Sequence, residues 1–111
     1  MSIIRDGCII TLLSVLLFWG LQPHAACAEA PRVLLLHSYH PGYQWTDDIT
    51  EAITSAFDQA ERVDLRIEYL DTKRYATAEH FTELKHSLSL KYRYTRFAAI
   101  ICVDNHALTF L

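Results

Sequence analysis

The residues from His37 to Asp48 carry most of the side chains in this chain that could take part in chemistry. The stretch reads HSYHPGYQWTDD, and its first nine residues hold two histidines, a serine, two tyrosines, a tryptophan and an amide. Hydroxyl, amide and imidazole groups can hold a polar ligand group, while aromatic rings can stack on an apolar ligand body. An ordinary connection needs only turn formers such as Pro41 and Gly42. The alternative interpretation is that the aromatic side chains only cover the end of a sheet.

The sequence on either side of this stretch predicts a loop that connects a buried strand to a helix. The nearly continuous apolar run from Arg32 to His37 is typical of a strand covered on both faces in a parallel sheet. A helix is predicted over 47–59, because its apolar residues recur at the spacing of one buried stripe. In an open α/β sheet, such a loop lies at the carboxyl end of a strand, where ligands bind.

The rest of the chain continues the alternation of strands and helices. Alternating residues over 63–70 predict a second strand near a sheet edge, and the continuous apolar run over 97–103 predicts a third and most buried strand. Helices are predicted over 77–93, with Thr77 as the N-cap, and from His106 onward. This β-α-β-α-β order requires right-handed crossovers and a parallel sheet. We expect a three-layer α/β fold with strand order 2-1-3, as in flavodoxin-like folds and in the halves of periplasmic binding proteins.

The carboxyl ends of these three strands define the predicted ligand site. Strands one and three would be neighbours there, and strand two would reach the same rim. The predicted ligand-binding residues are His37, Ser38, Tyr39, Tyr43, Trp45, Asp71, Asp104 and Asn105. Ser38 and Asn105 suit a carboxylate or another polar head group, and the aromatic residues suit a ring or an aliphatic body. Asp104 has two open interpretations, a partner for a ligand amine or a cap for the third helix.

A metal site is the main rival use of the same residues. His37, His40, His106 and Asp104 would offer three nitrogens and one oxygen, a set that suits zinc. Their spacing matches no common metal motif, so the sequence predicts no metal site. Neither a nucleophile elbow nor a glycine-rich phosphate loop is present, and Gly42 alone cannot build a phosphate cradle. We therefore predict no catalytic residues and no cofactor, and we keep an exported metal-dependent enzyme that uses the His37 and His40 loop as the alternative.

The first 28 residues have the pattern of a secretory signal peptide. Arg5 precedes an apolar run from Cys8 to Leu21, and the small residues Ala26 and Ala28 fit a cleavage site after Ala28. The run is shorter than the roughly twenty residues that span a bilayer. The sequence therefore predicts a periplasmic protein, with residues 29–111 forming the ligand-binding part. An uncleaved inner-membrane anchor and a lipoprotein modified on Cys27 are the alternatives.

The distribution of charge bears on the classes of partner that this chain could bind. The chain has 10 Lys and Arg against 13 Asp and Glu, and they are interspersed along the predicted helices rather than gathered in a basic stripe. Nucleic acid is therefore not an expected partner.

Cys102 would be the only cysteine left after cleavage, which excludes an internal disulfide bond. Its apolar surroundings predict an inert buried thiol.

Two segments carry a resemblance to a known family. The sequence LLLHSYHPGYQWTDDI, followed by IEYLDTKR, resembles the start of the ABC-type substrate-binding-protein-like domains of bacterial periplasm. Such domains occur as free solute-binding proteins and as the extracytoplasmic sensor regions of histidine kinases and diguanylate cyclases. The resemblance covers the chain from Arg32 to its end.

The resemblance implies a small-molecule ligand and a role as the N-terminal piece of a sensor in a signal-transduction receptor. The alternative within the family is a free solute-binding protein of an ABC importer. The implied protein partner is a kinase or cyclase domain in the first case and an importer permease in the second. Three strands are few for a complete domain, so we expect the fold to be incomplete at the C-terminus. Membrane association would then come through an uncleaved N-terminal segment or through a region beyond Leu111.

Overall fold

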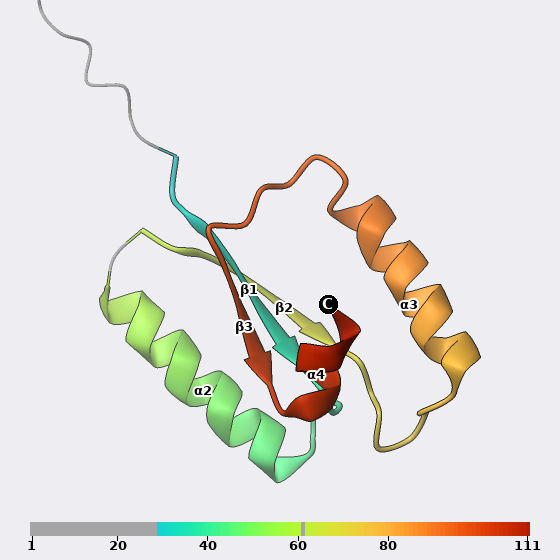
Figure 1. Ribbon diagram of the computed structural model, residues 1–111. Coiled ribbons are helices and arrows are strands. Elements are labelled where there is room, and N and C mark those ends of the chain that lie inside the picture. The colour runs from blue at the N-terminus through green and yellow to red at the C-terminus, as the bar shows by residue number, and fades with distance from the viewer. Residues whose placement is uncertain (1–28, 61) are drawn as a thin grey trace, which may run out of the picture.

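The computed structural model describes residues 29–60 and 62–111, so the predicted signal peptide lies outside the described residues. The elements are β1 (Arg32–His37), α2 (Gln44–Gln59), β2 (Asp64–Tyr69), α3 (Ala78–Lys91), β3 (Ala99–Val103) and α4 (Asn105–Phe110). All three strands are parallel, in the order β2-β1-β3 (Figure 1). The predicted α/β class and the predicted strand order 2-1-3 are confirmed.

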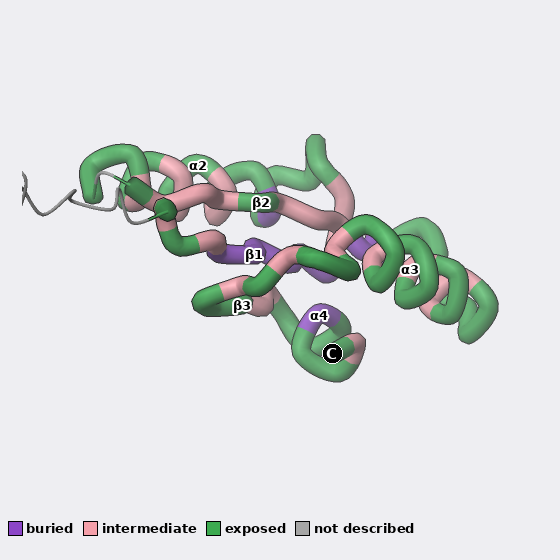
Figure 2. The backbone as a smooth tube through the Cα atoms, turned by 90° about the horizontal axis from the view of Figure 1, so that it is seen from above, coloured by how far each residue is buried: buried purple, intermediate pink, exposed green. Residues whose placement is uncertain are grey.

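The helices cover the sheet from both sides. The helix α2 lies on one face, and α3 and α4 lie on the other (Figures 1 and 2). Right-handed crossovers explain this arrangement, because α2 leads from β1 to one neighbour and α3 leads across β1 to the other. Because all three strands are parallel, their carboxyl ends lie at one edge of the sheet.

The central strand β1 forms the core of the molecule. Its residues from Val33 to Leu36 are all buried, as the purple segment of Figure 2 shows. On the side of α3 and α4, Leu36 clusters with Leu70 and Ala107. Four partly buried side chains pack against this cluster, namely Phe81, Leu84, Cys102 and Phe110. The continuous apolar run of β1 is thus explained by coverage on both faces.

The prediction that the third strand is the most buried is wrong. The first residues of β3 are exposed, with Ile100 at 42%, and the remaining residues are half-buried. β3 pairs only with β1 in the described part of the chain, and the six residues of α4 cover little of its surface. Cys102 is half-buried as a result, so the prediction of a buried thiol is also wrong. An apolar run shows that a strand has apolar side chains on both faces. It does not show whether the strand lies at the centre or at the edge of the sheet.

The first helix begins earlier than the sequence predicts. α2 starts at Gln44 rather than at Asp47. The backbone carbonyl of Tyr43 accepts hydrogen bonds from the N–H groups of Thr46 and Asp47, at 2.8 and 3.0 Å. The Asp47 carboxylate accepts a further bond from the Gly42 N–H at 2.9 Å. These bonds satisfy donors at the helix start, so the last part of the predicted loop becomes the first turn of α2.

The predicted N-cap of the second helix is confirmed. The Thr77 side chain accepts a hydrogen bond from the His80 N–H at 3.2 Å, and α3 follows directly. His80 Nε2 in turn donates to the carbonyl of Leu70 at 2.8 Å. The start of α3 is therefore hydrogen-bonded to the residue that follows β2, at the carboxyl edge of the sheet.

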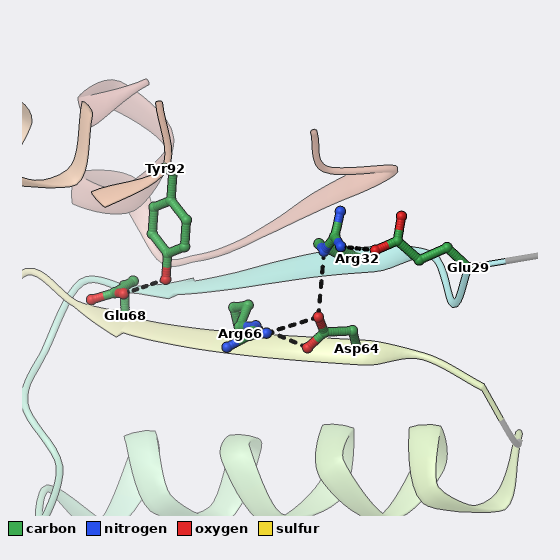
Figure 3. A network of polar contacts seen from close by, with 6 residues as sticks. All are labelled: Glu29, Arg32, Asp64, Arg66, Glu68 and Tyr92. Atoms are coloured by element: carbon green, nitrogen blue, oxygen red, sulfur yellow. Dashed lines mark hydrogen bonds and ion pairs between the residues drawn. The ribbon is translucent and has the colours of Figure 1, made fainter. Parts of the chain in front are cut away.

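Charged residues join the strands at the opposite, amino-terminal edge (Figure 3). Arg32 and Asp64 face each other as the first residues of β1 and β2, and their side chains lie 3.5 Å apart. Asp64 also pairs with Arg66 at 2.8 Å, and Arg32 with Glu29. These side chains are between 30% and 73% exposed. Exposed ion pairs of this kind contribute little to stability.

Candidate functional site

Ser38 connects the carboxyl ends of β1 and β3. Its hydroxyl donates to the Val103 carbonyl at 2.7 Å and accepts from the Ala107 N–H at 2.9 Å. The Ser38 N–H donates to the same Val103 oxygen at 3.2 Å. The residue is only 1% exposed. Its hydroxyl is thus used to hold the start of α4 against the sheet, and its predicted contact with a ligand stays a prediction.

The end of β2 is attached to the same residue. Both the N–H and the hydroxyl of Thr72 donate to the carbonyl of Ser38, at 2.9 and 2.8 Å. Just before it, the Leu70 N–H donates to the His37 carbonyl at 2.8 Å. The end of β1 is therefore hydrogen-bonded to the ends of both neighbouring strands. We call Ser38, Thr72 and Val103 the strand-end platform.

His37 points into the protein toward α2. Its ring is buried and stacks on Tyr69, with ring centres 5.2 Å apart. Nε2 lies 2.9 Å from the Thr50 hydroxyl. That hydroxyl gives its own hydrogen to the Thr46 carbonyl at 2.7 Å, so Nε2 is the donor to Thr50. Nδ1 is then a bare acceptor with no partner among the described residues.

Burial controls the charge of this histidine. It lowers the pKa of His37 below the ordinary value of 6.5, and the nearby charge of Asp47 opposes this shift. The ring is therefore neutral near pH 7. The Thr46 hydroxyl oxygen is a second buried side-chain polar atom without a partner in the described chain. The predicted role of His37 as a ligand contact stays a prediction, and the structure directs its side chain to the interior.

Tyr39 and Asp104 join above the platform. The Tyr39 hydroxyl donates to Asp104 Oδ2 at 2.7 Å and connects the loop after β1 with the loop after β3. Asp104 also accepts from the Asn105 N–H at 2.6 Å, as the cap of α4. These two bonds, the larger contribution coming from Tyr39, lower the pKa of Asp104, so the side chain is a carboxylate.

Asp104 has an unusual backbone conformation. Its φ of 74° lies in the left-handed region, which is uncommon for a residue other than glycine. Asp71, which follows β2, has a φ of 56°. Strained residues of this kind tend to gather at functional sites. Two of the three strand ends at this edge therefore carry an aspartate with a left-handed backbone.

Lys73 lies over the tyrosines of this edge. Its Nζ is 4.7 Å from the centre of the Tyr39 ring and 5.3 Å from that of Tyr43. The two rings meet edge to face, with centres 5.4 Å apart. Lys73 forms no ion pair with a carboxylate of the described residues. We call Tyr39, Tyr43, Lys73 and Asp104 the rim cluster.

The sequence did not single out Lys73. A signal was present, because Lys73 belongs to the IEYLDTKR segment and stands two residues after Asp71, just beyond the second strand. A cation that follows a strand in this topology reaches the ligand edge as readily as an acid does. The two tyrosines that Lys73 contacts, however, come from the loop after the first strand, so the sequence near Lys73 does not show this contact.

Three other predicted residues make no side-chain hydrogen bond or ring contact with the rim cluster in the described part of the chain. Trp45 stands in the first turn of α2 and is 57% exposed, and its ring pairs with neither tyrosine among the described residues. Asp71 binds Arg74 Nε at 2.8 Å. Asn105 is exposed at the first position of α4. Of the eight predicted residues, Tyr39 contacts both Tyr43 and Asp104 through its side chain, and Asn105 reaches Asp104 only through its backbone N–H.

The histidines considered as metal ligands do not meet. Within residues 29–60 and 62–111, no group of three or more His, Cys, Asp or Glu side chains is arranged to hold a metal ion. His37 is turned toward Thr50, while His40 Nδ1 lies 2.9 Å from the carbonyl of Pro41. The donor set of His37, His40, His106 and Asp104 is therefore not assembled.

Comparisons with known proteins give no family assignment. No family model matches the chain, and searches of curated proteins and of solved structures found no match. In the described ranges, no helix has the length and apolar character needed to cross a membrane.

Proposed function

We propose that this chain is an exported small-molecule-binding domain, the N-terminal piece of the extracytoplasmic sensor of a bacterial signal-transduction receptor. The observation that carries this proposal is the rim cluster. It gathers side chains from the loops after β1, β2 and β3 at the carboxyl edge of a parallel sheet, where ligands of such folds bind. The resemblance of residues 34–49 and 67–74 to periplasmic sensor domains supports the same proposal.

The chemistry of the rim cluster suits recognition. Asp104 supplies a carboxylate and Lys73 an ammonium group, both on exposed residues. Tyr39 and Tyr43 offer aromatic faces beside these charges. The strand-end platform below holds the loops in place through bonds that need no ligand. A polar or charged small molecule with an apolar part would meet complementary groups at this edge.

A ligand screen tests the proposal. The 111-residue chain would be heated with amino acids, carboxylic acids, sugars or polyamines, one class at a time, while its unfolding is followed by fluorescence. A ligand of the native state should raise the melting temperature in a concentration-dependent manner. Tyr43→Ala should then weaken the binding of that compound by about 1–3 kcal/mol, the loss typical of an aromatic anchor.

Two further aromatic variants make the test specific. Trp45→Ala asks whether the exposed tryptophan also reaches the ligand, as the sequence predicts. Tyr94→Ala is the matched control, because Tyr94 is 91% exposed and lies in the turn after α3, outside the rim cluster. Equal losses in Tyr43→Ala and Tyr94→Ala would refute binding at the rim. A screen without any stabilising compound would count against the ligand-binding function itself.

The coding sequence beyond Leu111 separates the two members of this class. A transmembrane helix followed by a kinase or cyclase domain would support the sensor. A second α/β lobe followed by a stop codon would support the free solute-binding protein of an importer, with a permease as its partner. Periplasmic location is part of the proposal, and N-terminal sequencing of the exported protein should find Glu29 as the first residue.

A further inference from the structure

A pocket separate from the rim cluster is lined by residues of α3 and α4. Figure 1 shows these two helices on the face of the sheet opposite α2. Its volume is about 420 Å³, within the range of small-molecule sites. α3 contributes Phe81, Thr82 and Lys85, and α4 contributes His106, Thr109 and Phe110. Each set follows the three- and four-residue spacing of one helix face. Each helix therefore presents an aromatic ring and a basic side chain to the same space.

The aromatic rings form an apolar wall. The centres of the Phe81 and Phe110 rings are 6.3 Å apart, and the ring planes are inclined by 49°. The His106 ring lies 6.3 Å from Phe81 and is nearly parallel to it, at 21°. Rings at these distances and angles offer both faces and edges to a further ring. A planar aromatic group is thus the apolar body that this wall would best accommodate.

The charge of the pocket favours an anion. Lys85 Nζ lies 3.3 Å from the Phe110 carbonyl, and it has no carboxylate partner in the part of the chain that the structure describes. No Asp or Glu is among the described residues that line the pocket. The hydroxyls of Thr82 and Thr109 already donate to backbone carbonyls, so they have no hydrogen to donate to a carboxylate and do not add to its binding. The one fixed charge of the pocket is therefore positive.

We propose that this pocket binds a small aromatic carboxylate. The ring packs against Phe81 and Phe110, and the carboxylate accepts a charge-assisted hydrogen bond from Lys85. This proposal does not depend on the rim site, because the two sites share no residue.

Benzoate is the probe for this site. We expect titration of the isotope-labelled 111-residue chain with sodium benzoate to give saturable amide shifts centred on Phe81, Lys85, His106 and Phe110. Benzamide has the same ring without the charge and should bind about tenfold more weakly, the difference expected for a charged hydrogen bond. Lys85→Gln should weaken benzoate binding by a similar factor and leave benzamide binding unchanged.

Two control variants distinguish binding in this pocket from a general effect of charge and from binding at the rim cluster. Arg93→Gln removes one positive charge from an exposed residue just after α3, and Tyr43→Ala alters the rim cluster. Both variants should bind benzoate as the unchanged chain does. Equal affinity for benzoate and benzamide, equal losses in Lys85→Gln and Arg93→Gln, or the absence of saturable shifts at α3 and α4 would each overturn the proposal. A loss in Tyr43→Ala alone would place benzoate at the rim and would also overturn it.

Discussion

The two ends of the sheet are built from the same three strands but are held together by different interactions. At the carboxyl end, Ser38 and Thr72 make short hydrogen bonds between buried groups. At the amino end, Arg32, Asp64 and Arg66 form ion pairs between side chains that are at least 30% exposed. Neutral hydrogen bonds of buried side chains therefore connect the strand ends at the carboxyl end, whereas exposed ion pairs connect β1 and β2 at the amino end.

This difference predicts that the loss of one interaction destabilises the carboxyl end more than the amino end. A buried donor or acceptor that loses its partner is left without water to replace it, whereas an exposed charge is readily solvated. The carboxyl end must also hold the rim cluster in place, because Tyr39 and Lys73 follow the platform residues Ser38 and Thr72 directly. We therefore expect substitutions at the carboxyl end to have the larger effects.

The largest effect is expected for Ser38→Ala. Loss of the hydroxyl leaves the buried Ala107 N–H without its acceptor, which should reduce the free energy of unfolding by about 1–3 kcal/mol. Urea denaturation of the 111-residue chain, followed by circular dichroism, measures this change. Ser55→Ala, at an exposed position of α2, is the control and should unfold like the unchanged chain. Equal stability of Ser38→Ala and Ser55→Ala would show that the platform is not a stabilising feature.

A smaller effect is expected from acid, through His37. Burial lowers the pKa of His37 below its ordinary 6.5, so the unfolded chain binds this proton more readily than the folded chain. The contribution to stability is fully present above pH 6.5, and it is lost as the pH falls below 6.5 toward the folded-state pKa. His37→Phe keeps a ring beside Tyr69 and should flatten this part of the pH dependence of unfolding.

The exposed His86 provides the control for the acid experiment. His86→Gln should retain the pH dependence of the unchanged chain, because the side chain is exposed on α3. Denaturant midpoints measured at several pH values would show the difference. If His37→Phe and His86→Gln lose stability equally in acid, His37 is not the source.

The smallest effect is expected at the amino end, for Asp64→Asn. The variant removes the ion pairs with Arg32 and Arg66, and exposed pairs of this kind contribute only about 0.2–1 kcal/mol. The difference from the unchanged chain should shrink further in about 1 M salt, where charges are screened within a few ångströms. Urea denaturation at low and high salt measures it. A loss larger than that of Ser38→Ala would reverse the comparison between the two ends.

The sequence by itself determined the order of the elements and the topology of the sheet. The apolar run of β1 and the helix stripe that follows are local patterns, and right-handed crossovers leave few ways to arrange three parallel strands. The capping role of Thr77 was equally readable, because its partner His80 is three residues away. The sequence also placed Tyr39, Tyr43 and Asp104 at one edge.

Only the tertiary structure decided what each of these side chains does. Ser38 and Val103 are 65 residues apart in the chain, and nothing near Ser38 in sequence shows that its hydroxyl is already bonded. The burial of His37 against Tyr69 and the position of Lys73 over two tyrosines likewise depend on which loops meet. The exposure of β3 depends on its place at the sheet edge. Local patterns determine elements because their hydrogen bonds are local, whereas burial and side-chain partners are set by neighbours that are distant in sequence.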